Sequence, residues 1–563
     1  MNRAWWGKTD CYYVWVVLAA AAFHFPLLWV GHALSNSDYA FMIQESASFL
    51  RKGWTPFFVG QNYGGTLLSL FRPLFPGGPH FFSYIVCPAL ISVAGYFFLK
   101  SFLSLRAARW TALFLSMGTG FLTHQYGNDF YIAYMILGLI LLGLRLRWGD
   151  PWEMTSPLRL FGLSVLSGLV LYVFRGSLIF VVAAWLPSAQ TLRAMPQVLR
   201  GAKGGEKGLV VLAGALSVFF GYLWFFGETL GDWGGRPVKL SAEPNLKFAG
   251  MILVLLFIRH HWREGTGKGF KAWGRRFCWI GLGLLVGFSP EFISCLAREG
   301  WIPGGGSGGL ASFSHAARSF GKLPGVMAEL VDTDTSLDRI FPRVALGVSF
   351  YLLLVESVYR PNLRVLVSVF ALSICAYCGI AVYDDAPARY LFPIFPALLA
   401  GYGVAISRGL RSRGWAVAIS IVMLGAAFHT LRGRMAQVYS SALNQRQAEI
   451  EWVAARVKNA EVDLVLTNDY WETHQYALPD LDRLHFYISG GLNPRATLDL
   501  VHEVRRSIRL AALWDLDQSG QQEKVFTFNQ RDVRMKKVGS TSHRTLWVAE
   551  EPFLSEPQAS ERK

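Results

Sequence analysis

Long apolar runs recur along most of the chain, and they limit the possible folds more than any other feature. Many of them reach or approach the ~20 residues that a helix needs to cross the ~30 Å hydrocarbon core of a bilayer. Of the 563 residues, 52% are hydrophobic and only 16% are charged, which is far less charge than a soluble chain of this length carries. The sequence therefore predicts a polytopic α-helical membrane protein.

The apolar runs predict about thirteen membrane spans, of which the fifth, sixth and eighth are short or separated by very few residues. We expect these spans over residues 11–30, 80–99, 108–123, 130–146, 159–173, 176–190, 208–226, 248–259, 277–293, 341–357, 364–382, 389–406 and 415–430.

Charge alternates between successive connections, and this alternation predicts the orientation of the spans. The formal net charge is +16, but the cations lie in short connections, which indicates positive-inside topology and not nucleic-acid binding. The cation-rich connections contain Arg106, Arg145, Arg147, Lys203, Arg276 and Arg408, among others. The acid-rich connections contain Asp38, Asp129, Glu228, Asp332 and Asp384, among others. We therefore expect the acids outside the cytoplasm, and an odd number of spans places the carboxy terminus outside as well.

The chain divides into a membrane bundle, a small extracytoplasmic α/β domain and a disordered tail. These parts cover residues 1–437, 438–554 and 555–563. Two long outer loops interrupt the bundle, at 31–79 and 294–340. The first loop contains an expected interfacial helix over 44–58. The second contains a glycine-rich run at 304–309, which predicts a flexible linker or, alternatively, a mobile lid.

Alternating strand and helix signals after residue 438 predict the α/β fold of the outer domain. We expect strands at 463–466, 484–488, 510–513, 525–528 and 545–549. We expect helices at 442–458 and 497–507.

Asp38 follows the first apolar run, so it is expected just outside the membrane, at the mouth of the bundle. A hydroxyl group is a poor nucleophile at neutral pH, and a carboxylate within hydrogen-bonding reach can take its proton as a new bond forms. Asp38 is therefore a candidate general base. A solvated loop aspartate or a helix N-cap is the structural alternative.

Asp129 opens the fourth expected span from the outer side, directly after Asn128. It could orient an acceptor, or it could serve only to begin the helix, and the sequence leaves both open. His32 and His124 are polar neighbours of the same loops, but histidine at a membrane interface is more often structural.

Arg389 opens a late span from the outer side, after Asp384 and Asp385. A guanidinium can bind a phosphate through two parallel hydrogen bonds, and it stabilises a phosphate leaving group without titrating. The alternative is an arginine that pairs with one of the two aspartates and anchors the interface. Arg175, between two short expected spans on the same side, is a weaker phosphate-binding candidate.

The segment Gly60-Gln61-Asn62-Tyr63-Gly64-Gly65-Thr66-Leu67 resembles a motif of bacterial membrane glycosyltransferases of the GT-C class, close to GQ-x-Y-x-G-T/S-L-E. These enzymes also place an acidic residue in the first outer loop, as Asp38 is placed here. The later segment Arg389-Tyr390-Leu391 with Pro393 resembles their last-loop motif. The overall plan is similar to the branch of protein O-mannosyltransferases and lipid A aminoarabinose transferases.

The resemblance implies an enzyme of the bacterial cytoplasmic membrane that takes a sugar from a polyprenyl-phosphate carrier and transfers it, with inversion, to an acceptor hydroxyl on the outer face. It implies a catalytic base in Asp38 and a positioning role for Asp129. It assigns donor phosphate binding to Arg389, with Arg175 as a second candidate from its position alone, and substrate binding to Gln61, Tyr63 and Tyr390. The acceptor is a glycan, a lipid or a protein, and the membrane lipids surround the bundle.

Two positions depart from the family pattern. Many relatives read Asp-Glu where this chain has Asp38-Tyr39, and the glutamate that often follows the glycine-rich segment is Leu68. A divalent cation bound by those acids is therefore left open, and no other cofactor is expected.

Two other functions compete with glycosyl transfer. A transporter or lipid flippase would have a similar number of spans, but transport sites place ionisable residues near the middle of the bilayer, and the expected spans are nearly free of acids. A non-catalytic scaffold whose outer domain binds a partner is the third possibility.

Overall fold

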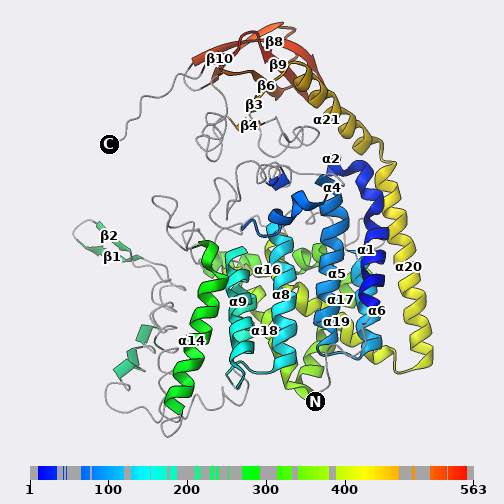
Figure 1. The fold of residues 1–563 in the computed structure, drawn as a ribbon, viewed down its shortest axis with the longest axis vertical. Coiled ribbons are helices and arrows are strands. Elements are labelled where there is room, and N and C mark those ends of the chain that lie inside the picture. The colour runs from blue at the N-terminus through cyan, green and yellow to red at the C-terminus, as the bar shows by residue number, and fades with distance from the viewer. Residues whose placement is uncertain are drawn as a thin grey trace.

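The computed structural model describes much of the helical bundle and of the carboxy-terminal domain (Figure 1). The continuous described ranges are 11–34, 65–75, 79–118, 129–152, 154–173, 178–186, 269–291, 313–331, 340–379, 388–467, 507–528 and 531–554. Shorter pieces lie at 42–43, 46, 208–209, 211–212, 215–216, 229–233, 236–239, 252 and 485–488. The glycine-rich run at 304–309, the tail at 555–563 and all but one residue of the expected interfacial helix lie outside these ranges.

Apolar helices build the bundle, as the sequence predicts, because a buried or lipid-facing backbone must satisfy its own hydrogen bonds. Within the described ranges, six helices of 19 to 26 residues are long and apolar enough to cross a membrane. The principal helices are α1 (Tyr12–His24), α5 (Cys87–Lys100), α6 (Leu105–Met117), α8 (Asp129–Trp148), α9 (Pro157–Val173), α10 (Leu178–Trp185), α14 (Gly269–Gly287), α17 (Ile340–Tyr359), α18 (Arg364–Gly379), α19 (Phe395–Gly409) and α20 (Arg413–Val438).

Most of the expected span at 208–226 and all but one residue of the expected span at 248–259 lie outside the described residues, so a count of about thirteen stays a prediction. Most of the other expected spans coincide with helices. The expected span 130–146 is α8, and the expected span 277–293 begins eight residues after α14 does, at Gly269.

Short elements gather at one end of the bundle, where α8 begins. We call this the Asp129 end, and the opposite end, where α8 finishes, the Arg147 end. The short elements are η1 (Phe25–Val30), α2 (Gly31–Leu34), η2 (Ser69–Leu74), α4 (Pro79–Phe81), η3 (Phe82–Val86) and η7 (Ala388–Ile394). They give this end an irregular backbone over the regular helices below it (Figure 1).

Two elements in the outer loops were not expected from the sequence. The helix α16 (Phe313–Val331) occupies the second long loop and buries Ala316, Leu323 and Val326 along one face. A hairpin of β1 (Thr229–Trp233) and β2 (Arg236–Lys239) lies at 229–239, and its paired ends, Trp233 and Arg236, are separated in sequence by two glycines, which favour tight turns.

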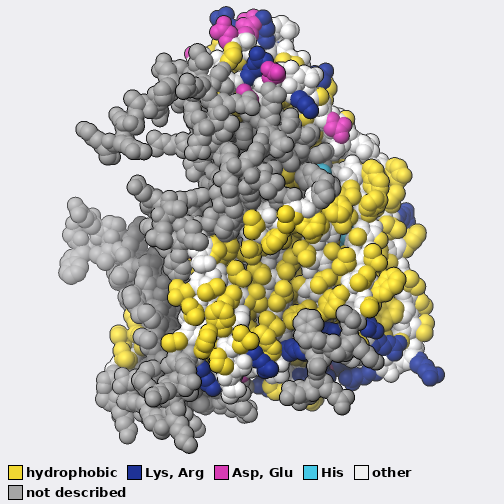
Figure 2. Space-filling view, in the orientation of Figure 1, with side chains coloured by type: hydrophobic (Ala, Val, Ile, Leu, Met, Phe, Trp, Pro, Cys, Tyr) yellow, Lys and Arg dark blue, Asp and Glu magenta, His cyan; other side chains and the backbone are white. Residues whose placement is uncertain are grey.

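The surface of the bundle changes from apolar to charged along the helix axes. On the face that Figure 2 shows, a broad apolar belt has lysine and arginine along its border at the Arg147 end, and acidic side chains lie on the carboxy-terminal domain. Exposed apolar residues such as Trp15, Leu424 and Phe428 form part of this surface, and they are what a lipid-facing helix requires. The pattern agrees with the charge alternation in the sequence.

The carboxy-terminal domain follows α20 through a second helix, α21 (Ser441–Asn459). Its sheet has six strands in the order β4-β3-β6-β9-β8-β7, with β3 parallel to β4 and β6 and the other pairs antiparallel. The strands are β3 (Leu464–Thr467), β4 (His485–Ile488), β6 (Leu510–Asp515), β7 (Glu523–Phe528), β8 (Arg531–Ser540) and β9 (Arg544–Ala549), and β5 (Ser507–Ile508) pairs separately with β10 (Phe553–Leu554).

Side chains of this sheet alternate between two cores, as the two-residue period of a strand requires. Val465 packs with Ile450 and Val453 of α21 on one face, whereas Leu464 and Leu466 join Trp547 on the other. The five strands and the helix at 442–458 that the sequence predicts are therefore present, and β8 was missed. The helix expected at 497–507 lies outside the described residues except for its last residue, which starts β5.

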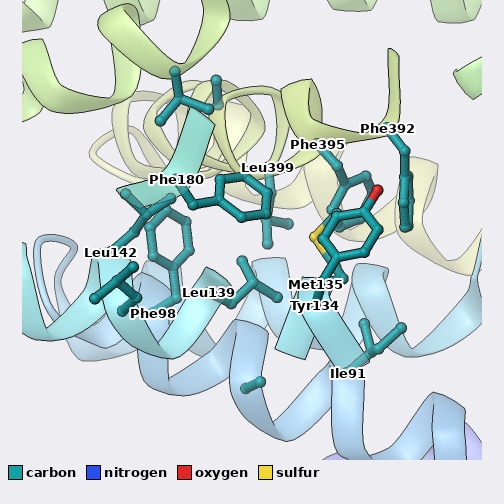
Figure 3. Close-up of a cluster of buried hydrophobic side chains, with 14 of the residues drawn as sticks. Ile91, Phe98, Tyr134, Met135, Leu139, Leu142, Phe180, Phe392, Phe395 and Leu399 are labelled. Carbon is teal, nitrogen blue, oxygen red and sulfur yellow. The ribbon is translucent and has the colours of Figure 1, made fainter. Parts of the chain in front are cut away.

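The core of the bundle lies where α5, α8, α10 and α19 meet. Figure 3 shows Phe98, Phe180, Leu142 and Leu399 interleaved there, all of them buried.

Glycines allow the backbones of α9 and α14 to approach very closely, as small residues often do between membrane helices. An added Cβ at Gly287 would lie 2.1 Å from the carbonyl oxygen of Val165, and one at Gly283 would lie 2.7 Å from that of Phe161. Gly168 makes the reciprocal approach from α9, 2.8 Å from the carbonyl oxygen of Leu284. By contrast, an added Cβ at Gly281 of the same helix meets no atom within 4 Å.

We expect Gly287→Ala to lower the free energy of unfolding by about 1–3 kcal/mol, because backbone atoms on both helices must move apart. Gly281→Ala is the matched control on the same helix and should leave the stability unchanged or slightly higher. Thermal unfolding of the detergent-solubilised variants measures both. Equal midpoints for the two variants would show that α9 and α14 do not pack in this way.

Candidate functional site

Buried charged side chains and buried histidines gather toward the Asp129 end of the bundle. Among the described residues of the bundle they are His24, Arg72, His80, Asp129, Glu291, His315 and Arg434. Arg145 and Asp150 are buried at the opposite end. Between the two ends, the buried polar side chains that are described are hydroxyls, for example those of Ser92, Thr111, Ser164 and Ser167.

Asp129 and Arg72 form a buried ion pair that joins the first outer loop to the bundle. Asp129 is fully buried and Arg72 is 6% exposed. The guanidinium binds both carboxylate oxygens, through Nη2 to Oδ1 and through Nε to Oδ2 at 3.3 Å. The Ser69 hydroxyl donates to Oδ2 at 2.5 Å. Such bidentate, charge-assisted contact is the arrangement that offsets the desolvation of two buried charges.

Local sequence places both partners of this pair. Ser69 and Arg72 lie three residues apart in the 3-10 helix η2, so their side chains fall on the same face. The Arg72 guanidinium also lies 4.9 Å from the centre of the Phe82 ring and donates to the Ser83 hydroxyl at 3.1 Å, both from η3. Asp129 is in the first turn of α8, where the helix dipole favours a negative charge.

The segment just before η2 is held against the end of α9. Gly65 donates its backbone N–H to the carbonyl of Val173 at 2.9 Å. An added Cβ at Gly65 would lie 2.9 Å from the Tyr172 ring, so glycine is needed for this close approach. The buried Thr66 forms a hydrogen bond with Tyr172, and the carboxylate of Glu291 is close enough to act electrostatically on the same tyrosine.

The helix η7, which contains Arg389 and Tyr390, lies beside the same part of α8. The ring of Phe392 is 5.8 Å from that of Tyr134, and Tyr134 is 5.7 Å from Tyr131, one turn closer to Asp129. Figure 3 shows Tyr134 next to Phe392 and Phe395. The backbone of Arg389 is thus three residues from a ring that touches α8, although its side chain is outside the described part of the structure.

The carboxy-terminal domain also meets the bundle at this end. The backbone N–H of Ala33, in α2, donates to Oε1 of Gln447 at 3.2 Å, which ties α21 to the residues that lead to Asp38. On its far side α21 binds the sheet, where Ser542 donates its hydroxyl to Glu449. The domain is thus fixed above α2 (Figure 1).

The structure tests the predicted site residues unevenly. Asp38, Gln61, Tyr63 and Arg175 lie outside the described residues, as does His124. Of the predicted set, Asp129 is described with its side chain, and its two oxygens are held by protein groups.

Sequence reasoning missed Arg72 and Glu291. Arg72 follows Leu70 and Phe71 in an outer loop where the charge alternation favours acids, but Arg51 and Lys52 lie in the same loop, so the sequence did not single out Arg72. Glu291 follows a long apolar run and carried no signal either. The question of a divalent cation stays open: the described residues contain no cluster of three or more His, Cys, Asp or Glu side chains, and Asp38 is not among them.

No protein-family model matches the chain, and no curated protein matches it either. Solved structures do. The apo oligosaccharyltransferase of Archaeoglobus fulgidus is 14% identical, with a TM-score of 0.44, and the alignment covers 91% of this chain and 70% of that one. ArnT from Cupriavidus metallidurans bound to undecaprenyl phosphate is 12% identical, with a TM-score of 0.35, over 96% of this chain and 98% of that one. Both are GT-C glycosyltransferases, the class that the sequence motifs resemble.

We expect Asp129→Asn to destabilise the protein by about 3–5 kcal/mol, because it leaves the buried Arg72 guanidinium without a counter-charge. Replacing both partners, Arg72→Met with Asp129→Leu, should cost less than the sum of the two single changes, since it leaves no buried charge. The unfolding midpoints of the wild type, Arg72→Met, Asp129→Leu and the double variant give the coupling energy between the two residues.

Glu356→Gln is the control for this cycle. It removes the shared partner of Arg408, at 2.8 Å, and Arg360, at 3.1 Å, and because both arginines are more exposed than Arg72 it should cost at most about 1 kcal/mol. If Asp129→Asn were as mild as the control, the Asp129–Arg72 pair would not be holding the loop.

Proposed function

We propose that this chain is an integral-membrane glycosyltransferase that moves a sugar from a polyprenyl-phosphate carrier to an acceptor hydroxyl on the outer face of the bacterial cytoplasmic membrane. The observation that carries the proposal is the uneven placement of buried charge. Among the described residues of the bundle, most of the buried ionic and imidazole groups lie at the end with the long loops, Arg145 and Asp150 lie at the other end, and the buried polar groups between the two ends are hydroxyls. One of the structures found contains undecaprenyl phosphate, which is the class of carrier that we propose.

The proposed reaction is a single displacement with inversion. The acceptor oxygen attacks the anomeric carbon, the bond from that carbon to the phosphate oxygen breaks, and polyprenyl phosphate leaves with the electron pair. Asp38 takes the acceptor proton as the new bond forms. Arg389, with Arg175 as a second cation, stabilises the charge that grows on the departing phosphate. Gln61, Tyr63 and Tyr390 contact the substrates in this scheme.

Asp129 has a positioning role in the proposal. Its oxygens are occupied by Arg72 and Ser69, so it orients the acceptor indirectly, by fixing η2 and the chain that leads into it. The segment with Gln61 and Tyr63 ends at Gly65, which is itself fixed on α9. Both anchors support the loop that follows Asp38.

The Asp129 end is the extracytoplasmic end in this proposal, because the lysines and arginines border the opposite end of the apolar belt (Figure 2). The carboxy-terminal domain, attached through α21 above α2, then lies outside the cytoplasm. It is placed to shape the access of the acceptor to the loop that contains Asp38.

We expect Asp38→Asn to leave the protein folded and inserted but to abolish transfer, because the acceptor loses its base. Membranes with either form receive a panel of radiolabelled polyprenyl-phosphate sugars, and release of free polyprenyl phosphate is followed. Asp232→Asn, in the β1–β2 hairpin, is the matched acidic control and should keep its activity. Substantial transfer by Asp38→Asn would rule out Asp38 as the base.

The same assay separates the flippase from the transferase. Movement of labelled lipid across the membrane without any new glycosidic bond would favour a flippase. The described middle of the bundle argues against that function, since midplane transport sites use ionisable residues that are absent from the described spans there.

We expect Arg389→Gln to reduce transfer by about a hundredfold, because the leaving phosphate loses a charge-assisted contact of about 3 kcal/mol. Arg389→Lys should be intermediate, since lysine keeps the charge but not the planar pair of donors. Steady-state kinetics with the active donor measure both, with Arg360→Gln at the other end as the control. Equal activities of Arg389→Gln and the control would remove Arg389 from the site.

A further inference from the structure

Two lysines lie on one face of the carboxy-terminal sheet, among the aromatic side chains of its core. Lys524 of β7 is opposite Met535 of β8, and Lys537 lies two residues further along β8, so the two lysines are diagonal neighbours on the same face. Both side chains are half-buried. Two like charges this close repel each other, so together they favour an anion between them.

One indole ring contacts both ammonium groups. The Nζ of Lys524 lies 5.9 Å from the centre of the Trp547 ring, and the Nζ of Lys537 lies 6.0 Å from it. The Phe526 ring is 6.1 Å from that of Trp547 and 5.2 Å from that of Trp514, which is half-buried near the end of β6. Cation–π contacts thus place both ammonium groups without an acidic partner.

Most of the N–H donors on the two lysines remain available. Lys537 donates once, to the backbone carbonyl of Asp517 at 3.3 Å. Lys524 contacts the rings of Phe526 and Trp547. Within the described part of the chain neither lysine forms an ion pair, and each ammonium carries three donors. An anion that reached the pair would therefore find donors on both sides.

The charge balance around the pair is positive. The carboxylate of Asp517 is close enough to act electrostatically on both lysines. Hydrogen bonds from Ser519, and then the charges of the two lysines, hold the pKa of Asp517 below its ordinary value, so it is ionised at neutral pH. Two positive charges thus face one negative charge, and one positive charge is left uncompensated among these three groups.

The indole N–H of Trp547 adds a further donor at the same place. Trp547 is fully buried, and among the described residues its N–H has no acceptor. A buried donor without a partner is costly and uncommon in native proteins. An anionic oxygen held between the ammonium groups would lie against the same ring and would supply the missing acceptor.

The position of the pair separates it from the membrane. The strand order runs from β4 to β7, and in Figure 1 the β4 edge lies toward the bundle whereas β8 lies at the far side of the sheet. A lipid headgroup at the edge of the apolar belt is therefore too distant to be the ligand. The half-buried ring of Trp514 offers an apolar face beside the charged donors, which suits a sugar ring with an anionic substituent.

We propose that Lys524 and Lys537 bind the anionic group of an acidic saccharide, a sugar unit that carries a carboxylate or a phosphate, with Trp514 against the sugar ring. Charge-assisted hydrogen bonds from the two ammonium groups hold the anion. The site goes beyond the proposed glycosyl transfer, because it uses none of the residues of that reaction and its binding is measured without a sugar donor.

The test is isothermal titration calorimetry of the full chain in detergent with tetragalacturonate, mannose 6-phosphate, neutral maltotetraose and inorganic phosphate. We expect an acidic saccharide to bind, and the tighter of the two identifies the anion. Lys524→Gln with Lys537→Gln should weaken this binding by roughly tenfold, because both charge-assisted contacts are lost. Arg534→Gln with Lys536→Gln is the matched control, since it removes two cations whose strand positions alternate to the opposite face.

Asp517→Asn tests the site in the opposite direction, so that misfolding cannot imitate the expected result. The amide keeps an oxygen for the N–H of Ser519 but removes the charge that opposes the anion. We expect it to tighten the binding of the acidic saccharide by roughly threefold, as the removal of one repulsive charge at about 6 Å in water predicts.

Five results would overturn the proposal. The absence of binding by both acidic saccharides would remove the site. Equal loss in the lysine variant and the control would reduce the effect to general surface charge. Unchanged or weaker binding by Asp517→Asn would place the anion elsewhere. Maltotetraose bound as tightly as the acidic saccharides would remove the role of the anion, and inorganic phosphate bound as tightly would remove the role of the sugar.

Discussion

The buried pair of Asp129 and Arg72 is the interaction on which the ordered end of this membrane bundle depends. Two charges at a membrane boundary lose much of their hydration, and only close, bidentate contact with further hydrogen bonds offsets that loss. The pair meets this condition with the hydroxyls of Ser69 and Ser83. It therefore fixes η2 on α8, and together with Gly65 on α9 it gives a long loop two rigid attachments.

In the described middle of the bundle, buried hydroxyls are satisfied within their own helices. Hydroxyls buried there bond to their own helices four residues back, as Thr111 does with Ala107, Ser164 with Leu160 and Ser373 with Val369. A hydroxyl bonded in this way donates its proton to a carbonyl of its own helix, so it needs no water and has no proton left to donate to another group. These helices therefore pack through apolar side chains and glycines, and glycine contacts such as those between α9 and α14 determine how closely helices approach.

Local pattern was sufficient for the regular elements and insufficient for the contacts between them. The apolar run at 130–146 predicts α8 to within two residues at each end, and alternation predicts β6 and β9. The pairing of Arg72 with Asp129 joins residues 57 apart in the chain, and no periodicity encodes such a partner. The helix α16 was missed because its amphipathic pattern follows a glycine-rich run inside a long outer loop, where the sequence predicts a flexible linker or a mobile lid.

Arginines near the two ends of α8 lie in opposite environments. Positive-inside patterning predicts only which side of the membrane a cation occupies. At the Asp129 end, Arg72 is buried with its counter-charge, so its energy is little affected by salt. At the Arg147 end, Arg147 is exposed, and its attraction for an anion falls over a screening length of about 8 Å at physiological salt. Burial, more than sequence position, therefore separates the arginines that hold elements of this bundle together from those that lie at its surface.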